Sequence, residues 1–191
     1  MKLNATTCDS TFIGVDSTNT VGCGSIAMTS DHKLYGLGCP YLFEIDTSNA
    51  QVTIISSNVS GGLSGANNLV ADSAGNLLSV GVNDSLYQIN RFTGQSFSLG
   101  YVGYSSAGDL TFYNDTLYLA AGDSCCTILV KIILSPFSAY VVGVMSSSLA
   151  IFGINTVCIN NVETMIASGG GGLNSYSNIY KVNPANASLT L

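Results

Sequence analysis

One short strand pattern occurs four times in this chain, and it limits the possible folds more than any other feature. Each copy is an apolar or aromatic run, and three of the four copies end in Asp or Asn. The copies occupy residues 42–46, 86–90, 129–133 and 179–183. Their first residues lie 44, 43 and 50 positions apart. Because a unit of this size cannot bury its own apolar face, such units stack on their neighbours. The pattern therefore predicts a repeat architecture and leaves the chemistry open.

Further strands surround each copy in the same order. An apolar run and a Leu- or Ile-containing strand precede it, and a turn and a last strand follow it, as in residues 47–55 and 91–99. The first two strands are separated by Asp, Asn, Ser and Gly, which tolerate positive φ or hydrogen-bond their own backbone. The first strands are expected at residues 26–28, 69–71, 110–112 and 157–159, and the second at 33–38, 76–81, 116–122 and 164–169.

Four short strands in about 45 residues resemble one blade of a β-propeller, and the resemblance extends over residues 22–191. It implies an all-β, β-propeller-like fold of four four-stranded blades plus an N-terminal half-blade. The chain has no Trp, so the Trp-Asp signature of WD40 blades is missing, and no paired-Gly kelch pattern is evident. No family's functional residues can be carried over. We predict one domain over residues 1–191, with blades at 22–65, 66–107, 108–153 and 154–191.

The half-blade belongs to an N-terminal segment, residues 1–21. Phe12, Ile13 and Val15 lie in a run that matches the diagnostic strand and ends at Asp16, only 30 residues before Asp46. No inner strands precede this run, so the strand is surplus to the four blades. It is expected either to close the ring against the last blade or to pair with another chain, because an unpaired strand edge is a template for association.

The composition excludes two classes of partner. Charged residues make up 8% of the chain, against about 25% in typical domains. Five Lys and Arg residues cannot form a stripe that follows a phosphate backbone, so no nucleic acid is expected.

The most apolar segment, residues 127–145, is nearly long enough to cross a bilayer. It contains Lys131 and Pro136, and the repeat places it on two strands, which predicts a buried hairpin and no membrane span. No signal-peptide pattern is visible at the N-terminus.

Cysteines and glycosylation sequons favour a secreted protein. Disulfide bonds are the expected state of the cysteines, with free buried thiols as the alternative. The cysteines are Cys8, Cys23, Cys39, Cys125, Cys126 and Cys158. Asn-x-Ser/Thr sequons fall in predicted turns or in the N-terminal segment, where a glycan could project into solvent. The sequon positions are Asn4, Asn58, Asn83, Asn114 and Asn186. Together these residues predict an extracellular or cell-surface glycoprotein.

No set of residues predicts catalysis, a cofactor or a metal. The single histidine, His32, lies in a polar turn and is expected to be solvated. Asp109, Asp115 and Asp123 fall in one blade, but two of them occupy turns. The glycine run at residues 169–172 lacks the Lys and the helix of a phosphate-binding loop. Three tyrosines outside the repeat positions are candidates for a binding surface: Tyr101, Tyr104 and Tyr176.

The sequence therefore favours a non-enzymatic, extracellular structural or adhesive domain. A sharper version has copies of the chain assembling into a surface filament or coat through the N-terminal strands, because a low charge removes the repulsion that keeps proteins apart. One alternative is a propeller module that binds a ligand or a carbohydrate, with glycans as its partners. A second is a propeller hydrolase or lyase, which would need a pocket holding at least two acids with perturbed pKa values.

Overall fold

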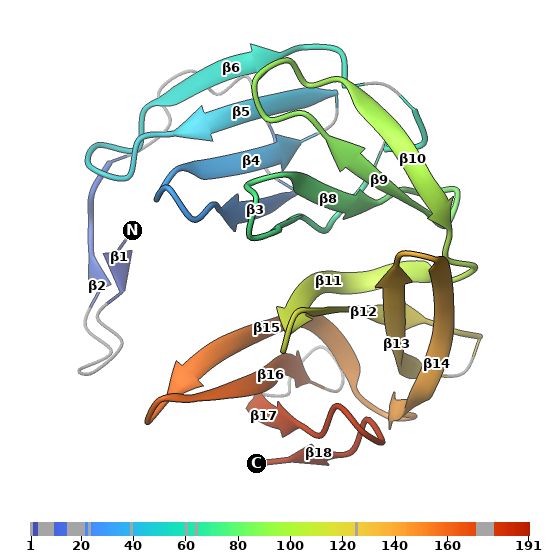
Figure 1. The fold of residues 1–191 in the computed structure, drawn as a ribbon. Helices are drawn as coiled ribbons and strands as arrows, with labels where there is room; N and C mark the ends of the chain where they lie inside the picture. Colours follow the sequence, from blue (N-terminus) through green and yellow to red (C-terminus); the bar gives the residue numbers. More distant parts are fainter. Residues whose placement is uncertain are drawn as a thin grey trace.

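The computed structural model describes residues 2–3, 10–14, 22, 24–38, 40–59, 61–63, 65–124, 126–170 and 178–191. Most of these residues form four antiparallel sheets of four strands each, arranged as the blades of a four-bladed β-propeller (Figure 1). None of the described residues is helical. The all-β propeller fold predicted from the repeat is confirmed.

Each blade runs in chain order from its innermost strand to its outermost strand. The strands of blade 1 are β3 (Ser25–Met28), β4 (Leu34–Gly38), β5 (Tyr41–Ile45) and β6 (Val52–Ser56). Those of blade 2 are β7 (Val70–Ala71), β8 (Leu77–Val80), β9 (Ser85–Ile89) and β10 (Ser96–Tyr101). Those of blade 3 are β11 (Ser105–Tyr113), β12 (Thr116–Gly122), β13 (Thr127–Leu134) and β14 (Phe137–Ser146). Those of blade 4 are β15 (Ala150–Ile159), β16 (Val162–Gly170), β17 (Asn178–Val182) and β18 (Leu189–Thr190).

Two innermost strands are longer than the sequence predicts. β11 begins at Ser105 and β15 at Ala150, so each starts ahead of the blade boundaries drawn at residues 108 and 154. Both strands contain a register shift, between Ser106 and Leu110 in β11 and next to Gly153 in β15. A β-bulge absorbs extra residues and lets the strand continue beyond the interruption. Small residues that look like a turn in the sequence are therefore part of the sheet.

The Asp or Asn at the end of the diagnostic strand has a structural role. In blade 1 the Oδ1 atom of Asp46 accepts a hydrogen bond from the Ser48 N–H at 2.8 Å, and in blade 2 Asn90 accepts one from Phe92 at 2.9 Å. Blade 4 repeats this turn at Asn183. A short side chain that caps the backbone two residues later fixes the turn into the outermost strand. The motif is therefore a turn signal and carries no catalytic chemistry.

Three apolar clusters hold the blades together, one at each junction between consecutive blades. The first includes Leu37 and Leu42 of blade 1 with Leu77 of blade 2, and all three are completely buried. The tyrosines expected to pack between blades are indeed buried, with at most 9% of their surface exposed; they are Tyr35, Tyr87, Tyr118 and Tyr180. Burial of large side chains at each junction supplies the main force that stacks the repeats.

The apolar segment at residues 127–145 is a blade hairpin. β13 and β14 pair antiparallel through eight positions, and Leu129 and Val130 on β13 are fully buried. The predicted hairpin of blade 3 is therefore present, but only β13 is buried, because β14 is the outermost strand and exposes Tyr140, Val141 and Val144. Among the described residues no helix is long and apolar enough to cross a membrane.

The N-terminal strands form a small sheet of their own. β1 (Lys2–Leu3) pairs antiparallel with β2 (Ser10–Thr11), and neither strand joins a blade. The expected strand at residues 12–16 is wrong over its described part, since Phe12 and Ile13 follow β2 and lie in no strand. A Cβ atom at Gly14 would lie 2.0 Å from the Asn49 carbonyl oxygen, so the chain passes closely by the β5–β6 turn there. Val15 lies outside the described residues.

Candidate functional site

The innermost strands of all four blades meet at one cavity of about 220 Å³. Every blade contributes two or three residues to its wall, because each repeat places its first strand at the centre of the arc (Figure 1). Eight of its ten lining residues are apolar, and the two polar residues are Asp109 and Asn155. The lining residues are Ile26, Ala27, Met28, Leu69, Val70, Ala71, Asp109, Leu110, Ile154 and Asn155. We call this space the central cavity.

Asp109 is the polar side chain that stands out in this wall. It lies on β11 at the register shift between Ser106 and Leu110, where the bulge changes the direction in which side chains point. Burial raises the pKa of its carboxyl from 3.8 to about 6, although hydrogen bonds from the backbone of Leu110 and Leu69 act in the opposite direction. The Leu110 N–H donates to Oδ1 at 2.9 Å. Of the described residues that line the cavity, none is a Lys, Arg or His that could neutralise the carboxylate.

A second cavity of about 130 Å³ adjoins the first along blade 4. The two cavities share Asp109, Ile154 and Asn155, so the carboxylate borders both spaces. The Asn155 Oδ1 atom accepts a hydrogen bond from the Thr156 N–H at 2.8 Å, which holds the amide in place. Ligand sites typically combine apolar walls with a few fixed polar groups. The central cavity and its neighbour have this combination.

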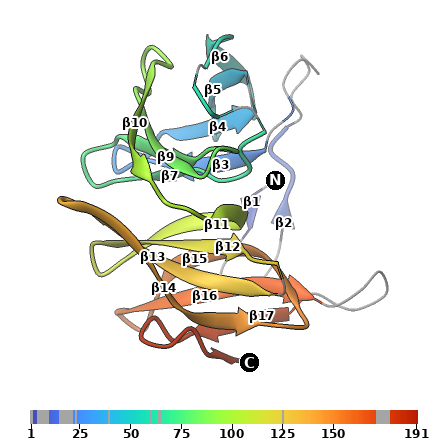
Figure 2. The same cartoon turned by 90° about the vertical axis from the view of Figure 1, so that its right-hand side faces the viewer.

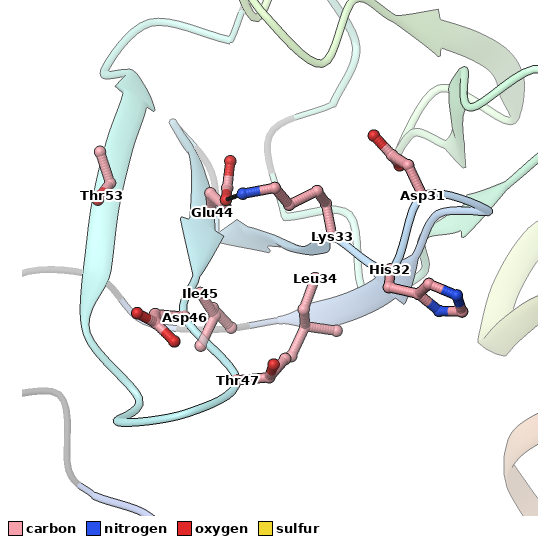
Figure 3. A pocket seen from close by; sticks show the side chains of 9 residues that line it. All are labelled: Asp31, His32, Lys33, Leu34, Glu44, Ile45, Asp46, Thr47 and Thr53. Carbon is pink, nitrogen blue, oxygen red and sulfur yellow. Dashed lines mark hydrogen bonds and ion pairs between the residues drawn. The ribbon is translucent and has the colours of Figure 1, made fainter.

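A larger pocket of about 350 Å³ lies at the turns of blade 1 (Figure 3). Figure 3 shows Lys33 directed at Glu44, with which it forms an ion pair. Asp31 pairs with Arg91 of blade 2 at 2.7 Å, and this contact, together with a hydrogen bond from the Thr29 hydroxyl, lowers the pKa of Asp31 to about 2. His32 is exposed in the β3–β4 turn with a positive φ of 61°, as expected of a solvated turn residue. The Asp31–Arg91 pair joins blades 1 and 2, and the Lys33–Glu44 pair lies within blade 1, so these charged side chains are engaged by the fold.

Two cysteines fall among the described residues. Cys126 is half-buried against the core between blades 2 and 3, and Cys158 is exposed on β15 and forms no disulfide bond. The other four predicted disulfide partners lie outside the described residues; they are Cys8, Cys23, Cys39 and Cys125. Disulfide bonding of this chain therefore stays a prediction.

The sequons differ in how well they could carry a glycan. Asn58, Asn114 and Asn186 are exposed in turns or loops, as predicted. The side-chain nitrogen of Asn83 donates to the Tyr87 hydroxyl at 2.8 Å, so this amide is engaged by the fold. Asn4 lies outside the described residues.

Tyr101 and Tyr104, two of the tyrosines proposed for binding, do not line the two cavities. Tyr101 is exposed at the end of β10, whereas Tyr104 packs against the core between blades 2 and 3. Tyr176 lies outside the described residues. Asp109 had no assigned role in the sequence, yet one signal pointed to it: a charged residue directly before the predicted apolar strand 110–112.

Solved structures similar to this chain show the same fold. A gluconolactonase from Xanthomonas campestris matches with a TM-score of 0.61 and 12% identity, over 86% of this chain and 59% of that one. An auxiliary nutrient binding protein from Bacteroides ovatus matches with a TM-score of 0.60 and 10% identity, over 84% and 47%. An extracellular domain assigned to a hybrid two-component system of Bacteroides thetaiotaomicron matches with a TM-score of 0.51 and 18% identity, over 93% and 24%.

These similarities establish the fold and no more. The chain spans between 24% and 59% of the length of these solved structures. No protein-family model and no curated protein matches it. The neighbours include an enzyme, a binding protein and an extracellular domain, and one fold hosts many functions.

Proposed function

We propose that this chain is a non-enzymatic, extracellular binding module that holds a small, donor-rich ligand, such as a monosaccharide, in the central cavity. The observation that carries the proposal is Asp109, a largely buried carboxylate at the junction of two cavities. A desolvated acid without a neighbouring cation is costly, and proteins retain such groups mostly where they serve a function. Hydroxyl or amine donors of a ligand would replace the water that the carboxylate has lost.

The remaining wall fits the same class of ligand. Asn155 adds a second fixed polar group beside Asp109, and Ile26, Met28 and Ile154 offer apolar surface. Sugar rings present hydroxyls on their edges and C–H groups on their faces, so they suit a wall of mixed polarity. A volume of about 220 Å³ is small compared with drug-binding pockets of about 300–1,000 Å³, which favours a single small molecule.

Two further observations support an extracellular binding role. One structural neighbour is an extracellular domain and another is a nutrient binding protein. Three sequons, at Asn58, Asn114 and Asn186, are exposed where an exported chain could carry glycans.

The two other functions considered from the sequence have less support. A hydrolase or lyase would need a second acid, and Asp109 is the only acid among the described residues that line the two cavities. Filament assembly through Phe12 and Ile13 would need a strand at these positions, and they lie outside β2.

The experiment is a binding screen with a matched set of variants. The chain would be titrated calorimetrically at pH 7.5 with common monosaccharides, amino acids and small amines. For a ligand found in this way, Asp109→Ala should weaken binding by about 10- to 100-fold, since hydrogen bonds to charged groups contribute about 1.5–3 kcal/mol. Asp115→Asn, an exposed turn acid of the same blade, is the control and should bind normally. Unchanged affinity in Asp109→Ala would refute the assignment of the site.

A further inference from the structure

The two ends of the blade series expose residues that are buried everywhere else in the repeat. We call the side of a blade that faces the following blade its forward face, and the opposite side its backward face. On the forward faces of blades 1, 2 and 3, the first apolar residue of the diagnostic strand is completely buried, with 0% exposure: Leu42, Leu86 and Leu129. The equivalent residue of blade 4, Ile179, is 66% exposed. No described element covers the forward face of blade 4 at this position.

The backward faces show the same contrast. In blades 2, 3 and 4 one apolar residue near the innermost strand packs toward the preceding blade and is at most 3% exposed: Leu69, Leu110 and Ile154. The equivalent residue of blade 1, Ile26, is 51% exposed. An apolar side chain at this repeat position is therefore buried in three blades and exposed in blade 1, because no described blade precedes blade 1.

Both open faces continue over several strands. On the backward face of blade 1, Met28 and Ile54 are about half exposed around the buried ring of Phe43. On the forward face of blade 4, Ile159 and Val162 form an exposed pair at the β15–β16 turn. Exposed apolar patches that extend over several strands are uncommon on monomers and mark sites of association.

The structure does not close the ring between these faces. Consecutive innermost strands contact one another from β3 to β7, from β7 to β11 and from β11 to β15. No comparable contact among the described residues joins β15 to β3, and Figures 1 and 2 show the β1–β2 hairpin beside this opening. The forward face of blade 4 and the backward face of blade 1 are therefore two halves of the repeated interface that do not pack on each other, although Ile26 and Met28 also line the central cavity.

We propose that a second copy of this chain covers these faces head to tail, with blade 4 of one copy packed on blade 1 of the other. The chain uses this pairing of a forward with a backward face at three internal junctions, and a second copy offers both halves at once. Two copies can form two such contacts and close on themselves. Charged residues make up only 8% of the chain, so little electrostatic repulsion opposes the contact. This chain spans about half of the similar solved chains, and those chains continue beyond the part that matches it.

Two single variants can test the head-to-tail arrangement. Ile54→Glu places a charge on the backward face of blade 1, and Ile179→Glu places one on the forward face of blade 4. Ile54 lines neither cavity, so Ile54→Glu tests the interface independently of the proposed ligand site, whereas Ile179 also lines the second cavity. Val144→Glu is the matched control, because Val144 is an exposed aliphatic residue on the outermost strand of an inner blade.

The readout is the mass in solution, measured by sedimentation or light scattering from about 1 µM to about 500 µM. The unmodified chain and Val144→Glu should rise to twice the monomer mass or more, whereas each face variant alone should stay monomeric. An equimolar mixture of the two face variants should form a 1:1 dimer, because one open face of each copy remains intact. A wild-type chain that stays monomeric over this range overturns the proposal, and so does an association that neither face variant reduces.

Discussion

The replacement Asp109→Asn is expected to stabilise the fold at neutral pH and to have no such effect in acid. Asp109 has a pKa of about 6 in the folded chain because burial disfavours its charge, against 3.8 for the ordinary side chain. Below pH 3.8 the carboxyl is neutral in both the folded and the unfolded state, so it imposes no ionisation cost. Between pH 3.8 and 6 the unfolded state loses the proton first, and the folded state is progressively destabilised. Above pH 6 the full cost is present.

The magnitude follows from the shift in pKa. A difference of about two pH units corresponds to about 3 kcal/mol at neutral pH. An Asn side chain removes this cost but has one acceptor oxygen in place of two, so one of the backbone hydrogen bonds from Leu110 and Leu69 is lost, at about 1 kcal/mol. The net gain in unfolding free energy is therefore about 2 kcal/mol, or about 4–8 °C in melting temperature for a chain of this size.

Urea denaturation of both proteins at pH 3.5, 5, 6.5 and 8 measures this effect. The difference in unfolding free energy should be absent or reversed in sign at pH 3.5 and should grow to its full value between pH 5 and 6.5. The control Asp115→Asn alters an exposed turn acid and should give a difference that is small throughout. A stabilisation by Asp109→Asn that is equal at pH 3.5 and pH 8 would show that the carboxylate is not desolvated in the cavity.

Three further predictions concern the packing of the blades. The buried Asn68 side chain accepts a hydrogen bond from the Val80 N–H at 2.6 Å and donates one to the Val80 C=O at 2.9 Å. Asn68→Leu leaves both backbone groups without this partner, so the unfolding free energy measured by urea titration should fall by about 2–4 kcal/mol. Gly36→Ala brings a Cβ atom to 2.2 Å from the ring of Phe43, so it should lower the melting temperature. Gly122→Ala is the control and should not, because its Cβ atom would make only an ordinary contact of 3.8 Å with Ala107. Ala50→Gly relieves a positive φ of 63° in the β5–β6 turn and should raise thermal stability by about 1 kcal/mol; a loss of stability would contradict this.

The fold was predictable from the sequence because its signals are local. Each strand and turn is encoded within a few residues, as in the Asx turns at Asp46 and Asn90, and the period then places the strands side by side. The apolar residues of the diagnostic strands identify which faces pack between blades, and Leu42, Leu86 and Leu129 are buried as this pattern requires. Boundaries were less predictable where a bulge extends a strand, as at Ser105.

The candidate site was not predictable in the same way. Asp109 and Asn155 are 46 positions apart in the sequence, and nothing in either segment indicates that they share a wall. The pKa of Asp109 depends on how much of the carboxyl is buried, which is a property of the packed blades. The N-terminal segment shows the same limit, since its apolar run at Phe12 and Ile13 matches the strand pattern without forming a strand.

The sequence by itself determined the all-β class, the four blades, their turns and the faces that become apolar junctions, because short-range backbone preferences and side-chain alternation encode these features. Only the tertiary structure decided that four innermost strands enclose a cavity around Asp109, since this requires the blades to curve around a common centre. It also decided that, among the described residues, β15 and β3 lack the contact that joins the innermost strands of consecutive blades. A repeat encodes the contact between neighbours, whereas the closure of an arc depends on the summed angle of all its blades.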